Sequence, residues 1–342
     1  MRAMAVTNYA APLELLDLPM PEVAPGYVLV RLLACGVCYT DVKVARGRMT
    51  WSSTVDLPHV PGHELSAEVV EAPPDSGFEP GDRVLVYNYW SCGRCPACLI
   101  GREVLCENLE GWVGFSTPGG FQEYLSVRPD RLLRVPEGIE AEEVCAASCA
   151  FGTGYRAVAT RGRVQPGEVV VILGAGGVGL HTLQIAREAG AHVLAVDVDP
   201  RKLEAATNLG AVGTALAGEE AQALVQDYTS GRGADVVIDI VGHEETLAEA
   251  GKMLRRAGRV VGLGYMPAGF SRFPIDVFVL QEKEFIGSRY AQRFEIERVL
   301  SMMAQGQIKP IIDDVLSLEQ AEEALQRLER GEVVGRTVLR IS

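Results

Sequence analysis

The arrangement of apolar and polar positions changes character along the chain. Up to about Val135 it consists of short apolar runs with interspersed polar positions, separated by clusters of Gly and Pro. Runs of this length and spacing are typical of β-strands joined by turns. The first part of the chain is therefore predicted to form an all-β, barrel-like domain. Its expected strands include residues 27–35, 65–72, 81–89 and 121–127.

From Gly167 onward, apolar runs alternate with helical patterns. This alternation predicts parallel strands connected by crossover helices, as in α/β proteins. Expected strands cover 169–173, 192–197, 234–242, 258–265 and 284–288, and expected helices cover 199–210 and 243–257. After Ser288, helices are predicted over 296–308 and 318–331, followed by a final strand at 336–341.

Composition and charge narrow the class of protein. A chain of 342 residues is long enough for two domains, each with a core of its own. A formal net charge of -13 disfavours nucleic acid and anionic membranes as partners. No apolar secretory signal is visible, and no stretch approaches the roughly 20 apolar residues of a membrane span. We expect a cytoplasmic protein, whose eight cysteines serve metal or thiol chemistry.

Four of those cysteines lie close together in the sequence. Cys92, Cys95, Cys98 and Cys106 have the pattern C-x2-C-x2-C-x7-C. Thiolates at this spacing can surround one Zn²⁺ in a tetrahedron. Disulfides and buried free thiols are the alternatives, and a reducing compartment disfavours the disulfides. The pattern predicts a closed, structural zinc site, because four protein ligands leave no position for a substrate.

A glycine-rich segment follows the strand at 169–173. Gly174, Gly176 and Gly179, with Gly177 and Val178 between them, form G-x-G-x-x-G in the strand-to-helix context of a dinucleotide site. The next strand ends in Asp197, 21 residues after Gly176. A carboxylate there accepts ribose hydroxyls and repels a 2′-phosphate, which favours NAD over NADP. Arg201 and Lys202 nearby weaken this preference. The alternative is an ordinary βαβ unit without a cofactor.

A second metal site is indicated by residues spread through the first half of the chain. Cys38, His63 and Cys149 supply two thiolates and one imidazole, which would leave one position open, as in catalytic zinc sites. Each residue alone is equally compatible with core packing or with a structural histidine.

Taken together, these motifs resemble the zinc-dependent medium-chain alcohol dehydrogenases over nearly the whole chain. The resemblance rests on Cys38 to Asp41, Gly62-His63-Glu64, Gly81 to Val84, the cysteine quartet, Cys149 ahead of Gly152-Thr153-Gly154, and the glycine motif. It implies a GroES-like, β-rich catalytic domain (1–151 with 288–342, and a zinc lobe at about 90–112). It also implies a Rossmann domain, a doubly wound parallel sheet, at 152–287.

The family resemblance also implies roles for individual residues. Cys38, His63 and Cys149 would bind the catalytic zinc, and Glu64 would lie beside the metal or join it transiently. Asp41 would orient His63, and the Thr40 hydroxyl would take the proton of the substrate alcohol. For Glu64 and Asp41 alone, a solvated or salt-bridged carboxylate is the alternative. The implied reaction is reversible hydride transfer between an alcohol and NAD.

Two positions depart from the family pattern. Tyr39 stands where the family often has His or Arg in contact with pyrophosphate, and Lys43 stands where a histidine often ends the proton relay. A lysine relays protons near neutral pH only if its pKa is strongly depressed. Two proton routes are therefore expected as alternatives, one that ends at Thr40 and the ribose and one that leaves through water.

The resemblance implies several further contacts. Arg336 would contact the cofactor's pyrophosphate, and Val241 and Leu263, at predicted strand ends, would contact the cofactor. Trp90 and Trp112 would line the substrate cleft, with packing of the zinc lobe as the alternative for both. Met49 and Trp51 lie in a segment that could also approach the cleft.

The implied substrate is a small alcohol or carbonyl compound, and the implied metal content is two zinc ions per chain. The resemblance also implies a homo-oligomer, with a tetramer favoured and a dimer as the alternative. Alternatives are a reductase of a conjugated aldehyde, a polyol dehydrogenase, and a non-catalytic protein that binds zinc and a dinucleotide.

Overall fold

The computed structural model describes residues 1–49, 55–265 and 275–342. Trp51 lies outside the described residues. The chain forms two compact units, one of Met1–Cys149 with Gln292–Ser342 and the other of Ala150–Ala291. The sequence-predicted division at 151/152 and 287/288 differs from these limits by two and four residues. Within the described ranges, no helix is both long and apolar enough to cross a membrane.

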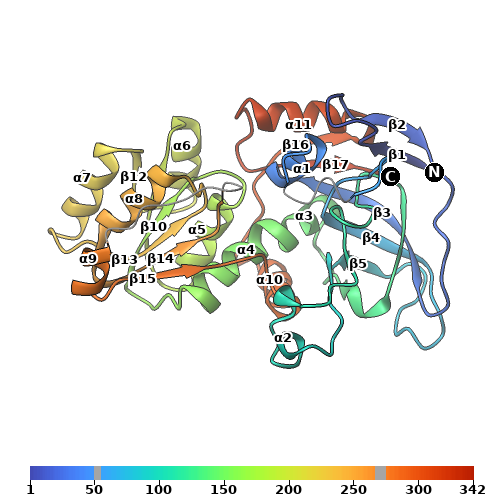
Figure 1. The fold of residues 1–342 in the computed structure, drawn as a ribbon, viewed down its shortest axis with the longest axis horizontal. Coiled ribbons are helices and arrows are strands. Elements are labelled where there is room, and N and C mark those ends of the chain that lie inside the picture. The colour runs from blue at the N-terminus through green and yellow to red at the C-terminus, as the bar shows by residue number, and fades with distance from the viewer. Residues whose placement is uncertain (50–54, 266–274) are drawn as a thin grey trace. The chain divides into compact units, whose positions relative to one another are not determined.

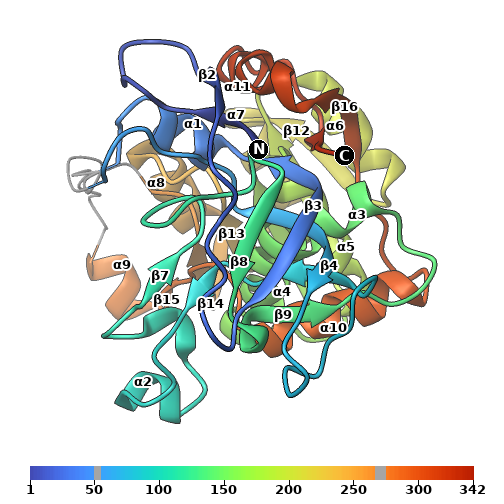
Figure 2. The same ribbon diagram turned by 90° about the vertical axis from the view of Figure 1, so that its right-hand side faces the viewer.

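The first unit is built on a mostly antiparallel sheet. Its strands run in the order β16-β17-β3-β4-β5-β9, and β8 pairs with β3 (Figure 2). β3 is long and buried nearly throughout, which suits a strand in the middle of a sheet. The larger sheet contains β3 (Val28–Val37), β4 (Glu64–Glu71), β5 (Arg83–Val86), β8 (Tyr124–Val127), β9 (Leu132–Arg134), β16 (Ile312–Ser317) and β17 (Arg336–Arg340). Two short pairs are formed by β1 (Arg2–Ala5) with β2 (Glu14–Asp17) and by β6 (Tyr89–Trp90) with β7 (Gly111–Trp112).

Before Val135, helices interrupt the first unit where the sequence predicted only strands and turns, whereas α10 (Arg293–Ala304) and α11 (Ala321–Glu329) lie where helices were predicted. The helix α1 (Tyr39–Ala45) begins immediately after Cys38, and the Asp41 side chain accepts a hydrogen bond from the Cys38 amide at its start. The expectation of an all-β region is therefore wrong at α1, because this capping arrangement nucleates a helical turn. The other helical segments of this unit are α2 (Pro96–Leu99), η2 (Glu103–Leu105), η3 (Pro129–Arg131), α3 (Ala141–Ala146) and η6 (Leu318–Gln320).

The second unit is a doubly wound parallel sheet with the strand order β12-β11-β10-β13-β14-β15 (Figure 1). All its strand pairs are parallel, as the βα alternation predicted. Its elements are η5 (Arg156–Arg161), β10 (Val169–Leu173), α5 (Gly179–Glu188), β11 (His192–Asp197), α6 (Pro200–Asn208), β12 (Gly213–Leu216), α7 (Glu219–Tyr228), β13 (Ala234–Asp239), α8 (Glu244–Met253), β14 (Leu254–Gly262), α9 (Ile275–Leu280) and β15 (Glu284–Gly287). The chain enters this unit through the π-helical η4 (Ala147–Phe151) and α4 (Gly152–Tyr155).

Helices cover both faces of this sheet. Val171 and Leu173 of β10 pack in one core with Val225 of α7 and Met253 of α8. The intervening Ile172 points the other way, toward the start of α5. Because side chains alternate along a strand, α5 and α7 must lie on opposite faces.

One predicted boundary in this unit is wrong. The sequence pattern extended a helix through Ala257, whereas α8 ends at Met253 and the strand β14 begins at Leu254. Leu254 pairs with Ala234 of β13 and is buried. The strand partner and burial override the local helical pattern of these residues.

A buried carboxylate stabilises the amino end of this sheet. Asp235 accepts hydrogen bonds from Arg232, Arg255 and the amide of Val169. Burial by itself would raise the pKa of Asp235, but these donors hold it well below its ordinary value.

We expect Asp235→Asn to lower the free energy of unfolding by about 2 kcal/mol near neutral pH. A carboxyl with a depressed folded-state pKa contributes stability above its unfolded pKa and loses that contribution as the pH falls through the folded pKa. The difference between wild type and variant should therefore be constant above about pH 5 and shrink below about pH 4. Melting temperatures measured across this range check it, and a difference that grows toward acid pH would contradict it.

Candidate metal centres and nucleotide-binding edge

Four side chains from distant parts of the first unit converge on one point. One potential ligand atom from each of Cys38, His63, Glu64 and Cys149 lies within 4.8 Å of the others. Cys38 precedes α1, His63 and Glu64 stand at the start of β4, and Cys149 lies in the π-helical segment η4. The structure thus brings together all the residues predicted from sequence for the second metal site.

Asp41 is fully buried and holds two members of this cluster. Its Oδ1 accepts a hydrogen bond from His63 Nδ1 at 2.7 Å, and its Oδ2 accepts one from the Cys38 amide at 2.8 Å. Because Nδ1 donates to this carboxylate, a neutral His63 carries its proton on Nδ1 and leaves the Nε2 lone pair available to a metal. Asp41 therefore prepares His63 as a ligand.

Glu64 supplies a carboxylate beside the two thiols and the imidazole of the cluster. Its carboxylate is fully buried, and among the described residues neither oxygen accepts a hydrogen bond. Arg336 Nη2 lies 3.2 Å and His63 Nε2 lies 4.0 Å from Oε1. Burial raises the pKa of Glu64 to about 7, and Arg336 acts in the opposite direction. A bound cation would compensate this poorly solvated charge.

The two thiols complete the donor set. A hydrogen bond from Cys149 lowers the pKa of the Cys38 thiol well below its ordinary value, while burial opposes the shift and Arg336 favours it. The thiolate is the form that binds metal. Two sulfurs, one imidazole nitrogen and a nearby carboxylate are the ligand types of catalytic zinc sites, so these residues fit Zn²⁺.

Arg336 was predicted to contact a cofactor, and the structure shows what it contacts within its own unit. It is buried, ion-paired with Glu64, and donates a hydrogen bond from Nη1 to the Val37 carbonyl at 3.4 Å. Its contact with pyrophosphate remains a prediction. The pair with Glu64 was not foreseen, because the two residues are 272 positions apart in the sequence.

The cysteine quartet forms a separate cluster with the geometry of a metal site. Sγ–Sγ distances are 3.5 Å for Cys95–Cys98, 3.9 Å for Cys95–Cys106 and 3.6 Å for Cys92–Cys106. A tetrahedral zinc with Zn–S bonds of about 2.3 Å places its sulfurs about 3.8 Å apart. All four thiols are free of disulfide bonds, so the quartet fits one Zn²⁺.

The zinc lobe is tied to the rest of its unit by polar contacts. Glu103 accepts a hydrogen bond from the Arg293 amide at 2.7 Å, at the start of α10. The buried Arg131 donates to the Ser91 hydroxyl at 3.1 Å, next to Cys92. These bonds fix both ends of the segment that carries the quartet.

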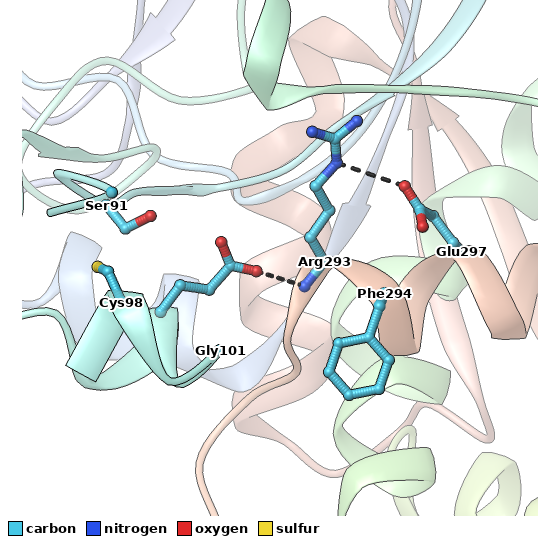
Figure 3. Close-up of a pocket in the computed structure, with 8 residues that line it drawn as sticks. Ser91, Cys98, Gly101, Arg293, Phe294 and Glu297 are labelled. Carbon is cyan, nitrogen blue, oxygen red and sulfur yellow. Dashed lines mark hydrogen bonds and ion pairs between the residues drawn. The ribbon is translucent and has the colours of Figure 1, made fainter. Parts of the chain in front are cut away.

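A cavity of about 490 Å³ lies beside the quartet (Figure 3). Its lining residues are Ser91, Gly93, Cys98, Gly101, Glu103, Arg293, Phe294 and Glu297. The charged groups in it are already matched, since Arg293 pairs with Glu297 at 3.4 Å and its amide with Glu103. None of the predicted catalytic residues lines this cavity.

Aromatic rings connect the zinc lobe to the metal cluster. Trp112 stacks on Phe115 with ring centroids 3.9 Å apart, and Phe115 lies 4.9 Å from the His63 ring. Met49 packs in the same small core as Phe115. Trp90 instead packs over Gly111 and against the main core of the unit. Phe115 was missed by the sequence reasoning, although its spacing of three residues from Trp112 was available as a signal.

The glycine motif joins β10 to α5 in the second unit. A Cβ at Gly179 would lie 1.9 Å from the Gly174 carbonyl oxygen, so only glycine permits this close helix-to-strand packing. A Cβ at Gly176 would meet open space, which is where a pyrophosphate would approach the backbone. Gly177 and Val178 complete the turn before α5. The motif therefore fits a dinucleotide.

Asp197 ends β11, the strand next to β10. Its Oδ2 accepts a hydrogen bond from the Ala175 amide at 2.7 Å, and Lys202 Nζ lies 3.9 Å from Oδ1. Arg201 is bound by Asp199, with Nη2 2.6 Å from Oδ2. The carboxylate thus lies against the glycine motif, at the edge where a ribose would bind.

Comparisons with known proteins agree with this geometry. Residues 24–137 match the alcohol dehydrogenase GroES-like domain, and residues 177–305 match the zinc-binding dehydrogenase family. The NAD-dependent alcohol dehydrogenase of Sulfolobus acidocaldarius is 36% identical over 351 residues, which cover 100% of both chains. An alcohol dehydrogenase of Geobacillus stearothermophilus is 34% identical, again over 100% of both chains.

A solved structure shows the same fold. The alcohol dehydrogenase of Aeropyrum pernix has a TM-score of 0.92 and 33% sequence identity, and the match covers 99% of this chain and 100% of that chain. The family matches, the full-length relatives and the shared fold lead to one conclusion: the chain belongs to the zinc-dependent medium-chain alcohol dehydrogenase family.

Proposed function

We propose that this protein is an NAD-dependent zinc alcohol dehydrogenase that interconverts primary or secondary alcohols and the corresponding aldehydes or ketones. The observation that carries the proposal is the buried cluster of Cys38, His63 and Cys149, with Glu64 beside it and Asp41 orienting the histidine. Full-length relatives named as alcohol dehydrogenases support it. We further propose two zinc ions per chain, one in each cluster, and a homotetramer.

The ligand residues define the catalytic centre. When bound, zinc would supply a Lewis acid that lowers the pKa of a substrate hydroxyl, and NAD would supply the hydride acceptor. Cys38, His63 and Cys149 would hold the metal, and Asp41 would keep His63 Nε2 directed at it. Glu64 and Arg336 would balance charge beside the site. The quartet has no position for a substrate and would serve folding.

The proton route begins at Thr40. Its Oγ1 lies 3.7 Å from Cys38 Sγ, beside the metal cluster, and this contact supports the proposal that the hydroxyl accepts the substrate proton. Lys43 lies on the same helix, with Nζ 5.9 Å from the centre of the Tyr39 ring. Burial lowers the pKa of Lys43, and the nearby Cys38 thiolate opposes part of this shift. Because its ammonium lies over the Tyr39 ring, we propose that Lys43 takes no part in the relay.

The preference for NAD rests on Asp197. Its negative charge stands where the adenosine ribose would bind, and Arg201 is committed to Asp199 and so does not offer its charge to a 2′-phosphate. The proposed substrates are aliphatic, cyclic or benzylic alcohols, because Trp112 is separated from His63 by one aromatic ring. Trp90 is the weaker candidate for this pocket, since it packs into the core.

An activity screen tests the proposed reaction. Protein with a measured zinc content should reduce NAD with medium-chain, cyclic or benzylic alcohols, and Cys149→Ser should lower kcat/KM by at least about 100-fold and remove one zinc. The buried Cys145, four residues earlier and outside the cluster, provides the control. Cys145→Ser should keep both metals and most of the activity. A fully zinc-loaded protein that turns over no alcohol or carbonyl with either cofactor would instead favour a non-catalytic binding role.

The separate roles proposed for the two zinc ions, one catalytic and one structural, give a second test. We expect Cys95→Ser to lose the structural zinc and to lower the melting temperature by at least about 5 °C, because metal binding contributes to folding of the lobe. The remaining folded protein should keep the other zinc and alter substrate selection only secondarily. Calorimetry combined with metal analysis checks this. A variant that melts normally but has lost its activity would contradict it.

The proton route gives a third test. Lys43→Ala should leave the apparent pKa values of the pH–rate profile within about 0.5 units of wild type, because the proposed proton route does not pass through the lysine. Thr40→Val is the matched comparison on the same helix, and it should lower kcat strongly at every pH. A large displacement of either limb of the profile in Lys43→Ala would restore the lysine as a relay group.

A further inference from the structure

Asp239 is a completely buried carboxylate in the second unit for which the sequence suggested no role. It is the last residue of β13, in the interior of the sheet between β10 and β14. A buried carboxylate is costly unless hydrogen bonds compensate for its lost hydration. The carboxyl ends of parallel strands are also where doubly wound sheets bind their ligands. The position therefore calls for a specific explanation.

The Asp239 carboxylate organises the loop that follows its own strand. Oδ1 accepts hydrogen bonds from the amides of Val241 at 3.0 Å and Gly242 at 3.1 Å. Oδ2 accepts one from the Thr246 hydroxyl at 2.9 Å, in the first turn of α8. One side chain thus fixes two amides of the loop after β13 and one hydroxyl in the first turn of α8.

The Asp239 backbone organises the neighbouring loop as well. Its carbonyl oxygen accepts hydrogen bonds from the amides of Leu263 at 2.8 Å and Gly264 at 3.2 Å, directly after β14. The two loops pack so closely that a Cβ on Gly242 would lie 2.0 Å from the carbonyl carbon of Gly264. A displacement of one loop must therefore move the other.

These loops lie on the half of the sheet opposite Asp197. β10 stands between β11, which ends in Asp197, and β13, which ends in Asp239. A dinucleotide lies across such a switch point with one mononucleotide over each half. The adenosine half is assigned to Asp197, so the loops held by Asp239, with the partly exposed Val241, face the nicotinamide half.

Resting on the proposed NAD-dependent function, we propose that Asp239 is a positioning residue for the nicotinamide half of the cofactor. It acts through the Val241 and Leu263 loops and does not itself touch the cofactor. The glycine motif and Asp197 bind the other half independently of it. Loss of the carboxylate should therefore weaken ligands that reach across the sheet, and should spare ligands that occupy only the adenosine half.

The same strand supplies a matched control. Asp235 stands four residues earlier, at the opposite end of β13, and is likewise a buried aspartate with several hydrogen bonds. Asp235→Ala makes the same chemical change as Asp239→Ala, but away from the ligand-binding edge. It should lower stability without changing cofactor affinity.

Calorimetric titration of the full-length protein with NADH and with ADP tests the proposal. ADP carries the adenosine half and the pyrophosphate but lacks the nicotinamide half. We expect Asp239→Ala to raise the Kd of NADH about tenfold or more while the Kd of ADP stays within about twofold of wild type. Asp235→Ala should leave both values unchanged.

Two further variants separate positioning from general destabilisation. Asp239→Asn retains an oxygen for the two loop amides, and its amide group can donate to the Thr246 oxygen, so NADH affinity should stay within about threefold of wild type. Thr246→Val removes a single donor and should weaken NADH binding about threefold, again with ADP unaffected. This milder variant keeps the test available if Asp239→Ala fails to fold.

The outcomes distinguish this proposal from the function on which it rests. A wild-type protein that binds ADP but neither NADH nor NADPH would overturn the proposed cofactor and the role of Asp239 with it. If the wild type binds both ligands, the positioning role alone is overturned by folded Asp239→Ala and Thr246→Val variants that keep wild-type NADH affinity or that lose NADH and ADP affinity equally.

Discussion

The hydrogen bond between Asp41 and His63 is the interaction on which the metal cluster depends. Asp41 is fully buried, so its charge must be matched, and it is matched by His63 Nδ1 and by the Cys38 amide. One side chain thereby sets the tautomer of one ligand and the backbone position of another. The helix α1 begins at this point because the same carboxylate caps it. Local secondary structure and ligand geometry therefore have a single physical cause.

In the second unit, too, buried carboxylates accept hydrogen bonds from backbone amides, here at the carboxyl ends of the parallel strands. Asp197 accepts the Ala175 amide of the glycine motif, and Asp239 accepts the amides of the loop after β13. Backbone amides at strand ends have no partner within the sheet, and a buried carboxylate can accept several of them at once. Such carboxylates fix irregular loops without enclosing them, which leaves the backbone open toward a ligand. Asp235 shows the contrasting case at the other end of β13, where the partners are mainly arginines and the effect is on stability.

The sequence predicted most of the fold because its signals were local. The change from period-two strands to alternating strands and helices separated two kinds of domain, and the parallel sheet followed from it. Apart from the locally capped helix α1, the predictions named below failed where a distant partner decided the outcome. Residues 254–257 have a helical pattern, but Leu254 pairs with Ala234 of β13 and is strand. Phe115 was not predicted as a site residue, yet its ring contacts those of both Trp112 and His63.

The sequence by itself determined the chemistry available to this protein: a thiolate quartet at short spacing, a glycine motif between a strand and a helix, and an acid at the end of the next strand. These features are local, so spacing alone reveals them. Only the tertiary structure decided that Cys38, His63 and Cys149 meet, that Arg336 pairs with Glu64, and that Asp239 joins two loops. These contacts depend on strand register and on the need to compensate buried charge, and both are properties of the folded chain rather than of any one segment.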